Sequence, residues 1–496
     1  MKKIILLLAA AALTSGAFAE GYQVNNMSAK QTGMGHVGTA MKLNSESIFF
    51  NPAAAAHQTS KFDISAGFTG IFASARYRSL PTMENNYTSG PVEKSDNKMA
   101  TPLHVYFNYK PIDRLSVGVG FFTPNGSTMK WNDNWSGANV IQEINLKAFT
   151  VQPTVSYKIC DRLSIGAGLM ITWGNFDLSR SMLPIGRGNA TLENGFNTVN
   201  YLLGTQGGAL GLTTDEIAAY QAQAQAGANY FADNLTDAPI VSAKLKGDAD
   251  VAIGVNAGFL WDITDEWSVG MTWRSRMNMK VGKGHGALTY GSAEAQQYLA
   301  FLNQMLTTAG QSPAIPALNT GSFNAELPLP TVVTWGVSFR PAVKWEFAVD
   351  LQWSGWSAYK DLNVAFNEKE LGIDDIYSIK NYSNTLAFRF GAQYRATDFL
   401  TARMGMYVDE SPVSSNYLNP ETPSMTKVSY TAGLSLRPTK YMSIDLAYCY
   451  VSSADPERTG SYPLYQYGKP TELTEVFSGN YSLHANVFSV GVGFSF

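Results

Sequence analysis

The stretch NVFSVGVGFSF, residues 486–496, has a bulky apolar residue at every second position. Successive side chains of a β-strand point to opposite faces, so a period of two predicts a strand with one apolar face and excludes an amphipathic helix. The apolar set is Val487 or Phe488, Val490, Val492, Phe494 and Phe496, and the alternate places hold Ser489, Gly491, Gly493 and Ser495. The same alternation recurs in the segments 114–122, 162–172, 266–273, 343–353, 399–408 and 441–451.

Extending this pattern along the chain predicts about fourteen strands. They lie near 61–73, 101–110, 114–123, 146–159, 162–178, 244–261, 266–280, 328–340, 343–353, 384–395, 398–408, 427–437, 441–452 and 484–496. The links alternate strictly, because short turns such as KPIDR, DITDE and RPTKY are each followed by a long connection. The long connections are 74–100, 124–145, 179–243, 281–327, 354–383, 409–426 and 453–483.

This organisation predicts an all-β fold, a transmembrane antiparallel β-barrel. An even number of strands, short turns at one rim, long loops at the other and apolar outward faces are typical of bacterial outer-membrane barrels. The barrel must be closed, because lipid cannot satisfy the hydrogen bonds of an open strand edge. Phe496 resembles the C-terminal signal that the outer-membrane assembly machinery recognises. Aromatic residues near strand ends suit interfacial girdles, and they are Trp261, Trp267, Trp345, Trp353 and Tyr441.

The first nineteen residues are typical of a secretory signal peptide. Lys2 and Lys3 precede an apolar run at 4–12, and Ala17-Phe18-Ala19 provides a small-x-small cleavage site. The run is too short to span a bilayer, which needs about 20 apolar residues. We therefore expect cleavage near Ala19 and a mature chain that begins at Glu20. No later apolar run reaches that length, which excludes a helical membrane protein.

Composition excludes several other classes of protein. Charged residues make up 15% of the chain, the formal net charge is −3, and no basic block points to nucleic acid. Cys160 and Cys449 are too few for a disulfide scaffold. The five histidines show no metal-ligand spacing, and neither H-E-x-x-H nor G-x-S-x-G occurs. We therefore expect no catalytic residue, no cofactor and no metal site.

Four ordered stretches span the mature chain and carry a family resemblance. They are GYQVNNMSAKQTGMGHVGTAM with SIFFNPAA, PLHVYFNYKPIDRLSVGVGFFTPNG, LPTVVTWGVSFRP with WEFAVDLQWSGWSAY, and RMGMYVDESPV. Together they resemble the FadL-type outer-membrane transporters of long-chain fatty acids and hydrocarbons (OMPP1/FadL/TodX). The resemblance implies a fourteen-stranded barrel at 61–496 and an N-terminal hatch at 20–60 that plugs the lumen. It also implies an extracellular hydrophobic groove, a pocket in the lumen and a lateral exit through the wall.

Two of the long loops carry helix signals. Thr213 and Glu216 form a capping box, and Ser292 and Gly310 mark the expected start and end of a second helix. Apolar residues on these helices are groove candidates, because burying an acyl chain contributes about 0.8 kcal/mol per methylene without any polar partner. The candidates are Ile217, Tyr220, Tyr298, Phe301, Leu302 and Met305. The alternative is that the two loops pack on each other and cap the barrel.

The run Pro124-Asn125-Gly126 follows the strand expected at 114–123. Proline has no N–H for the ladder and glycine weakens a strand, so within a wall this run should break pairing or form a bulge. The resemblance implies that this third strand is kinked inward and creates the lateral opening. The alternative is that the strand ends here and the run begins a loop.

The turn Asn51-Pro52-Ala53 ends the expected hatch. Pro52 cannot extend a sheet and disfavours helix at Asn51, so the turn is rigid, and the Asn51 side chain can hydrogen-bond the backbone around it. The resemblance implies that the turn lies beside the kinked third strand and helps to hold a lateral gate. The alternative is a linker turn into the first strand.

Inward parity places four charged residues in the lumen, namely Asp350, Arg389, Arg403 and Asp445. Arg389 and Arg403 flank a short turn at nearly equal distance, so they should lie opposite or diagonal to each other across the strand pair. Two adjacent like charges require anionic partners, such as Asp350, a hatch acid such as Glu46, or a fatty carboxylate. Salt bridges that fix the hatch to the wall are the expected role.

These features predict an outer-membrane channel of a Gram-negative cell for passive uptake of hydrophobic compounds, with long-chain fatty acids as the default substrate. A general porin for polar solutes is one alternative, and an unplugged, charge-lined lumen would favour it. An outer-membrane hydrolase is another, but no rim constellation of acid, base and nucleophile is found. The expected partners are hydrophobic small molecules, outer-membrane lipid and the assembly machinery, and the chain is expected to be a monomer.

Overall fold

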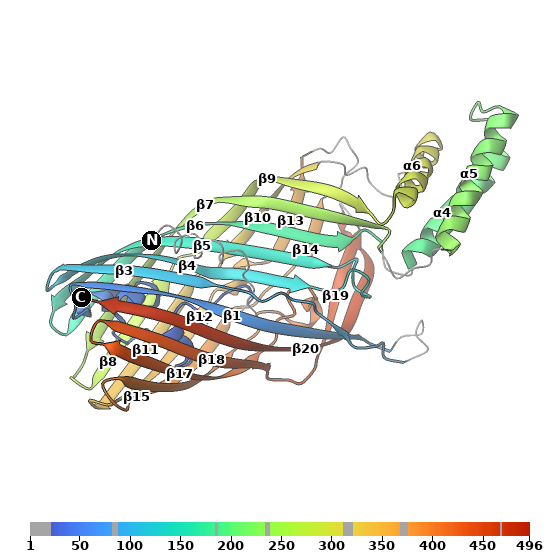
Figure 1. Cartoon of the computed structure of the whole chain (residues 1–496). Helices are drawn as coiled ribbons and strands as arrows, with labels where there is room; N and C mark the ends of the chain where they lie inside the picture. Colours follow the sequence, from blue (N-terminus) through green and yellow to red (C-terminus); the bar gives the residue numbers. More distant parts are fainter. Residues whose placement is uncertain are drawn as a thin grey trace.

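The structure is a closed antiparallel β-barrel (Figure 1). It is a computed structural model that describes residues 21–81, 88–183, 187–233, 239–310, 321–367, 375–466 and 469–496, so the expected signal peptide lies outside the described residues. Fourteen wall strands make up the described barrel, which confirms the prediction.

Nine of these wall strands are continuous. They are β1 (Phe62–Ser79), β3 (Leu103–Ile112), β4 (Leu115–Lys130), β5 (Glu143–Cys160), β6 (Leu163–Ser181), β7 (Val241–Asp262), β16 (Leu400–Asp409), β17 (Lys427–Thr439) and β20 (Lys469–Ser495). The other five are each split into two segments. The pairs are β8 (Trp267–Arg274) with β9 (Met277–Tyr290), β11 (Val332–Ala342) with β10 (Gly321–Leu329), β12 (Trp345–Ser354) with β13 (Asp361–Phe366), β15 (Thr385–Arg395) with β14 (Ile376–Ile379), and β18 (Met442–Ser453) with β19 (Arg458–Gln466). A short additional strand, β2 (Glu93–Lys94), pairs with β1.

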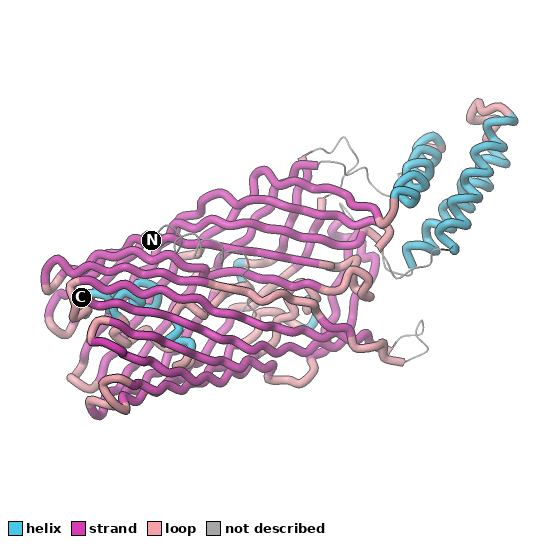
Figure 2. The backbone as a smooth tube through the Cα atoms, in the orientation of Figure 1, coloured by secondary structure: helices cyan, strands magenta, loops and turns pink. Residues whose placement is uncertain are grey.

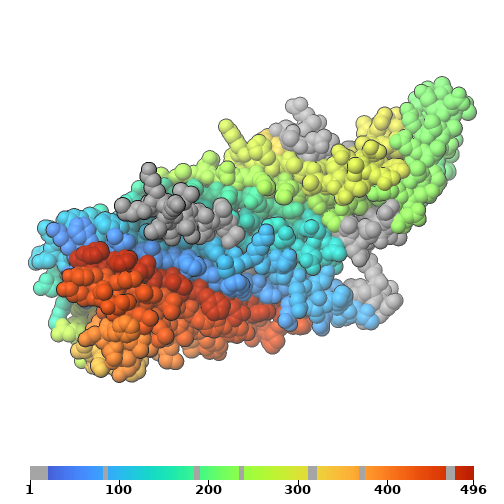
Figure 3. Space-filling model, in the orientation of Figure 1, coloured from blue at the N-terminus to red at the C-terminus, as the bar shows by residue number. Residues whose placement is uncertain are grey.

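The barrel closes between its first and last strands. The β1–β20 ladder runs from the Asp63–Ser495 pair to the Ser79–Gly479 pair, and β1 pairs with β3 on its other side. The carbonyl of Phe496 also accepts a hydrogen bond of 2.7 Å from the N–H of Lys61. Figure 3 shows the red C-terminal strands lying against the blue first strand. The closed wall predicted from the hydrogen-bonding argument is thus confirmed.

The alternation of the C-terminal stretch is also confirmed. Phe488 and Val490 of β20 point outward and are exposed, whereas Val487 and Ser489 point inward and are buried. Exposed aromatic residues lie on the outside next to short turns, and they include Trp261, Trp267, Trp345 and Tyr441, while Trp353 is half-buried. The outer surface therefore has the apolar face and aromatic girdle that suit lipid.

The two ends of the barrel differ. At one end, here called the turn end, the strands are joined by short connections such as 113–114, 161–162 and 343–344, and the C-terminus lies there (Figure 1). The opposite end, here called the loop end, carries the long connections. This is the arrangement of short and long links predicted from the sequence.

Residues 21–60, here called the hatch, fold inside the barrel towards the turn end (Figure 2). The hatch contains four short helical segments, α2 (Ala29–Thr32), η1 (Asn44–Glu46), α3 (Ser47–Phe50) and η2 (Pro52–His57). The four alanines at 53–56 are completely buried. Small side chains allow this part of the hatch to pass close to the wall strands.

Three helices, α4 (Arg187–Gln206), α5 (Thr214–Asp233) and α6 (Ala293–Thr308), project beyond the loop end (Figure 1). The predicted capping box is present, because the Thr213 N–H donates to Glu216 Oε2 at 2.8 Å. The predicted cap of the other helix is present as well, since the Ala295 N–H donates to Ser292 Oγ at 2.9 Å. Helix α4 was not predicted. Within the described ranges, none of the helices has the length and apolarity needed to span a membrane.

Several strands extend further towards the loop end than their alternation predicted. β4 continues to Lys130 rather than ending at residue 123, and β20 begins at Lys469 rather than at residue 484. The sequence of β20 before residue 484 carries polar residues without a consistent apolar face. A strand beyond the lipid no longer needs an outward apolar face, so the period-two signal fades there although the pairing continues.

Candidate functional site in the lumen

The Asn51-Pro52-Ala53 turn anchors the end of the hatch. Asn51 has extended backbone (φ −157°) and caps η2, because its Oδ1 accepts a hydrogen bond from the Ala53 N–H at 3.1 Å. Its Nδ2 donates to the carbonyl of Thr39 at 2.6 Å and to the carbonyl of Phe259 at 2.9 Å. One amide thus joins η2, the preceding hatch segment and wall strand β7.

The wall strands around this turn are shaped to receive it. The Ser156 hydroxyl of β5 donates to the carbonyl of Pro52. Gly166 of β6 leaves room for the turn, since a Cβ there would lie 2.5 Å from the carbonyl carbon of Pro52. The turn therefore lies chiefly against β5, β6 and β7, and a different part of the hatch contacts the Pro124-Asn125-Gly126 run.

The third wall strand is irregular at that run. The β3–β4 ladder ends at the His104–Phe122 pair, whereas β4 continues beside β5 to Lys130 with a register shift between Phe122 and Asn125. The strand therefore continues past the proline, and the alternative prediction, that the strand ends there and a loop begins, is wrong. On the β3 side, the described ladder does not extend along 123–129, and Asp96 N–H donates to the carbonyl of Lys130 at 2.7 Å beyond it.

The start of the hatch pairs with this interrupted part of β4. The Val24 N–H donates to the carbonyl of Pro124 at 2.8 Å, and the Gly126 N–H donates to the carbonyl of Tyr22 at 2.8 Å. Gln23 and Asn125 form the antiparallel bridge between these two bonds. Hatch residues 22–24 therefore pair with β4 at the residues where the β3–β4 ladder is interrupted.

At the loop end, the lumen above the hatch is apolar. Strand side chains from all around the wall meet loop residues that fold inward, and we call this cluster the apolar chamber. Its strand members include Met129, Leu146, Phe176, Leu178, Leu245, Met279, Phe323, Val364 and Tyr481, and its loop members include Trp131, Trp135, Trp356, Tyr359, Tyr382 and Leu418. Such a lining suits hydrocarbon and does not suit a hydrated solute.

The apolar chamber holds a cavity of about 50 Å³. Its lining combines the apolar residues Val140, Leu178, Leu245, Leu362 and Val364 with the polar residues Arg180, Glu421 and Tyr462. This volume corresponds to roughly two water molecules. A larger ligand can enter only if the inward-folded loop residues move.

Tyr22 links the chamber to the interrupted strand. Its ring packs edge-on against Trp356 at a centroid distance of 4.7 Å, and its hydroxyl donates to the carbonyl of Pro328. The next residue, Gln23, forms the bridge to Asn125. Tyr22 therefore contacts the chamber lining with its ring and β4 with its main-chain carbonyl.

Below the chamber, the hatch is bound to the wall by polar contacts. Asp350 Oδ2 accepts hydrogen bonds from the N–H of Gly38 (2.9 Å) and from the N–H and hydroxyl of Thr39 (3.1 and 2.9 Å). Asp350 lies directly across the β12–β15 ladder from Arg389, whose guanidinium is 4.0 Å from Asp409. Asp350 and Arg389 are thus both buried in the lumen, where Asp350 is hydrogen-bonded to the hatch and Arg389 lies near Asp409 of the neighbouring strand.

The expected neighbourhood of Arg389 and Arg403 is wrong. Arg389 lies opposite Tyr407, and Arg403 lies opposite Gln393, so the two arginines are four residues apart along the ladder. The turn between their strands shifts the register away from the symmetric count. Arg403 instead donates to Ser435, which donates to Asp445.

The second charge junction lies nearer the turn end. Lys30 of the hatch is 3.3 Å from Glu46 and 3.8 Å from Asp445. Another hatch lysine, Lys42, is 2.6 Å from Asp262 of β7. The four charged residues singled out from the sequence therefore divide into two hatch contacts, one through Asp350 and one through Asp445.

The six groove candidates lie in the projecting helices. Phe301, Leu302 and Met305 are at most 8% exposed and pack against α4 and α5, while Tyr220 and Tyr298 lie at the edge of this cluster. Ile217 lies next to Gly207, just after α4. The structure brings the two predicted loops together, but three of the candidates face the interhelical core rather than an open groove.

Sequence reasoning missed the residues that build the chamber from loops. Trp131 and Trp135 stack at a centroid distance of 4.4 Å, and the Trp131 Nε1–H donates to the carbonyl of Pro420 at 3.1 Å. The available signal was the apolar content of the expected loop 124–145. Helix α4 had a signal too, since Leu192, Phe196, Val199 and Leu203 recur at helical spacing.

Comparison with known proteins places the chain among outer-membrane transport proteins. Residues 10–496 match the family described as outer membrane protein transport protein (OMPP1/FadL/TodX). An outer membrane protein of Neisseria meningitidis serogroup B is 24% identical over 100% of this chain and 99% of its own length. The long-chain fatty acid transport protein of Escherichia coli O6:H1 is 23% identical over 42% of this chain and 44% of its own length.

Two solved structures share the fold. A Pseudomonas aeruginosa FadL homologue has a TM-score of 0.70 at 17% identity, covering 96% of this chain and 100% of its own. The Pseudomonas putida toluene transporter TodX has a TM-score of 0.62 at 17% identity, covering 96% of this chain and 99% of its own. At this level of identity the likeness concerns the fold.

Proposed function

Because the chain belongs to the OMPP1/FadL/TodX family of outer-membrane transport proteins, we propose that it passes hydrophobic compounds through the apolar chamber and sideways into the membrane between β3 and β4. One observation carries this route. The apolar chamber ends on the hatch beside the part of β4 that has left the β3 ladder and pairs with hatch residues 22–24.

The chemistry of the lumen favours the sideways exit. A hydrocarbon leaving the chamber towards the turn end would have to pass the buried junctions of Asp350 and Asp445 and lose about 0.8 kcal/mol for each methylene that leaves an apolar environment. The interruption of the β3–β4 ladder lies beside hatch residues 22–24, and Tyr22 of this segment packs against Trp356 of the chamber. Motion of Tyr22 would loosen the Tyr22–Gly126 and Val24–Pro124 hydrogen bonds and widen that interruption.

A long-chain fatty acid is the substrate that we propose first. Arg180 and Tyr462 line the chamber cavity beside Leu178, Leu245 and Leu362, so a carboxylate and an alkyl tail would both find suitable groups. An aromatic hydrocarbon is the second candidate. It is favoured by the likeness to a toluene transporter and by the ring-rich lining around Trp356 and Tyr382.

The other two sequence alternatives receive less support. A general porin needs a hydrated path, whereas the lumen here is apolar at the loop end and filled by the hatch at the turn end. A hydrolase needs an assembled catalytic group, and the family consists of transport proteins. Within the described residues there is no group of three or more His, Cys, Asp and Glu side chains that could hold a metal.

The double substitution Pro124→Val/Asn125→Thr tests the lateral exit. It supplies the missing N–H and two β-branched side chains, so pairing with β3 should be restored and the opening narrowed. We expect initial uptake of labelled oleate by a Gram-negative host lacking its own fatty-acid transporter to fall about tenfold. Parallel assays with toluene identify which of the two substrate classes depends on this route.

A matched control comes from the neighbouring strand. Pro153→Val changes an exposed wall proline in β5, whose pairing with β6 keeps one register on both sides of residue 153. Uptake by this variant should equal that of the unaltered protein. Unchanged uptake by the Pro124→Val/Asn125→Thr protein at equal surface abundance would contradict the proposed exit.

A further inference from the structure

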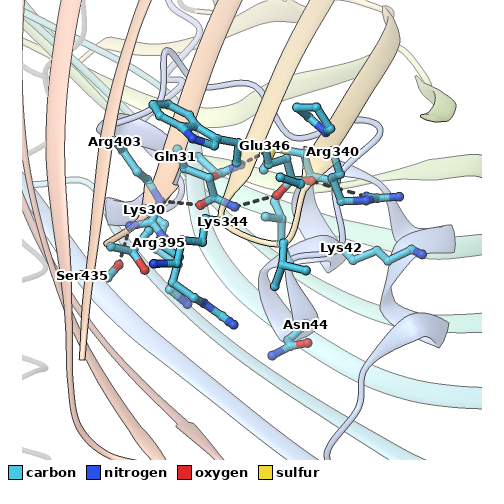
Figure 4. A pocket seen from close by; sticks show the side chains of 18 of the residues that line it. Lys30, Gln31, Lys42, Asn44, Arg340, Lys344, Glu346, Arg395, Arg403 and Ser435 are labelled. Carbon is cyan, nitrogen blue, oxygen red and sulfur yellow. Dashed lines mark hydrogen bonds and ion pairs between the residues drawn. The ribbon is translucent and has the colours of Figure 1, made fainter. Parts of the chain in front are cut away.

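A second, much larger cavity opens below the hatch at the turn end (Figure 4). It has a volume of about 580 Å³ and is lined by turn and strand residues together with the hatch residues Lys30, Gln31 and 41–44. Its cationic lining residues are Lys30, Lys42, Arg340, Lys344, Arg395, Arg403 and Arg437, and its acidic ones are Asp265, Glu266 and Glu346. This lining differs in character from the apolar chamber on the other side of the hatch.

Four of the seven cations already have partners. Lys30 contacts Glu46, Lys42 contacts Asp262, Arg340 contacts Glu346, and Arg403 donates to Gln393 and Ser435. Two of the three acids are likewise paired, Glu346 with Arg340 at 3.4 Å and Asp265 with Arg162 at 3.2 Å. These contacts provide partners for the charged residues closest to the hatch, but they do not involve the three remaining cations.

The remaining three cations, Lys344, Arg395 and Arg437, form no ion pair with any residue that the structure describes, and all three are exposed. Lys344, just before β12, lies beside Arg395 of β15, since the main-chain N–H of Arg395 donates to the main-chain carbonyl of Lys344 at 2.8 Å. Thr401 is the ladder partner of both Arg395 and Ser435, and Arg437 follows Ser435 on the same face of β17. Three unpaired cations thus line one side of a concave surface.

We propose that this cavity is an anion-binding site, for a small solute that carries a phosphate or carboxylate group. Guanidinium groups bind both with paired, charge-assisted hydrogen bonds. The volume is within the range of about 300–1,000 Å³ that small-molecule sites occupy. In outer-membrane barrels the short turns face the periplasm, so the solute would come from that side. The site lies apart from the proposed uptake route, because the hatch separates the two cavities.

A bound anion would also contact the hatch. Lys30 and Lys42 line the same cavity as Lys344, Arg395 and Arg437. An anion that bridges hatch lysines and turn cations adds favourable charge contacts to the closed arrangement. Binding therefore stabilises the hatch against the wall.

Calorimetric titration of the full-length protein in an uncharged detergent tests the site, with inorganic pyrophosphate and octanoate as separate probes. We expect saturable binding of at least one probe, and whichever binds more tightly assigns the anionic group as phosphate or carboxylate. Substitution of Lys344→Gln, Arg395→Gln and Arg437→Gln together should lower that affinity at least about tenfold, which corresponds to about 1.4 kcal/mol. Added salt should weaken binding to the unaltered protein, because it screens exposed charges.

The control is a triple variant with the same change in charge at the same end of the barrel. Lys61, Arg114 and Lys440 are exposed cations near the short turns and do not line the cavity, so their replacement by glutamine should leave the affinity unchanged. Heat-modifiable migration of each variant on gels verifies a folded barrel. Absence of saturable binding by the unaltered protein, or an equal loss in the control variant, would overturn the proposal.

Discussion

Asn51 shows how one side chain can hold a plug in place. Its amide satisfies the Ala53 N–H, the Thr39 carbonyl and the Phe259 carbonyl in a site from which water is excluded. A buried polar group left without a partner costs about 1–3 kcal/mol, whereas a formed hydrogen bond contributes about 1 kcal/mol. Asn51 therefore stabilises the hatch mainly because its loss would leave the Ala53 N–H and the carbonyls of Thr39 and Phe259 without this partner.

Asn51→Ala should loosen the end of the hatch without unfolding the barrel. The change removes the cap of η2, worth about 1 kcal/mol, and leaves two carbonyls without their donor. We expect the free energy of local opening to fall by about 3 kcal/mol, so amide hydrogen exchange across 52–57 should accelerate about a hundredfold. Mass spectrometry of the exchanged, detergent-solubilised protein measures this directly.

Asn51→Asp separates the two contributions. The carboxylate retains an acceptor for the Ala53 N–H but places negative charge beside the carbonyls of Thr39 and Phe259. Exchange should therefore be at least as fast as in Asn51→Ala. If either variant exchanged like the unaltered protein, the turn would be a passive linker, as the second sequence reading proposed.

The projecting helices form a small hydrophobic core of their own. Phe301 of α6 lies between Phe196 of α4 and Tyr220 of α5, at centroid distances of 6.4 and 6.1 Å. Leu302 is completely buried in the same cluster. The helices therefore depend on one another, and their core reaches the wall at the ends of β7 and β9, where Val241, Leu288 and Tyr290 join it.

Phe301→Ala should unfold the helical projection and spare the barrel. Truncating a buried phenylalanine costs about 3–5 kcal/mol, which is a large share of the stability of a three-helix unit. We expect limited proteolysis within 187–233 and 293–308 to become much faster while heat-modifiable migration stays unchanged. Gln304→Ala, an exposed change on the same helix, should leave the cleavage rate unaltered; cleavage of both variants at the same rate would contradict the packing role.

The wall strands were predictable from the sequence because the residue type at each position depends on which face of the strand it occupies. Phe488 and Val490 face lipid while Ser489 faces the lumen, so apolar and small polar residues alternate along the strand. The pairing of hatch residues 22–24 with Pro124 was not predictable in this way. It joins segments about a hundred residues apart, and neither segment has a sequence pattern from which the other could be identified as its partner.

The site residues divide along the same line. The inward positions of Asp350 and Asp445 followed from strand parity, but their hatch partners, Thr39 and Lys30, did not. The spacing of Arg389 and Arg403 misled, because the register across a turn depends on the turn's geometry as well as on the residue count. The chamber residues that loops contribute were not predicted, because loops have no periodic pattern of apolar residues.

Taken as one object, the molecule is a stable wall around a plug that carries its own acid-sensitive group. His36 of the hatch is buried, and neither ring nitrogen has a hydrogen-bond partner among the described residues. Burial, together with the positive charge of Arg389, lowers the pKa of His36 from 6.5 to about 3. The ring packs against Tyr407 at a centroid distance of 5.1 Å, and Asp350 lines the same small cavity.

The sign of the pH effect follows from that lowered pKa. His36 is neutral when the hatch is seated and has its ordinary pKa when the hatch is released, so the released state takes up the proton first as the pH falls. The stability of the seated hatch is fully present above a pH of about 6.5 and is lost progressively below it, by about 2 kcal/mol at a pH of about 5. Burial lowers the pKa of His57 to about 4 as well, which acts in the same direction.

We therefore expect acid to release the hatch before it affects the barrel. Hydrogen exchange of residues 29–41, corrected for the intrinsic effect of pH, should accelerate about thirtyfold between neutral pH and a pH of about 5, while strand amides stay protected. His36→Gln is the matched control, because it keeps a polar side chain of similar length but cannot take up a proton there. A smaller acceleration in this variant would assign the effect to His36, whereas an identical acceleration would place the acid-sensitive group elsewhere in the lumen.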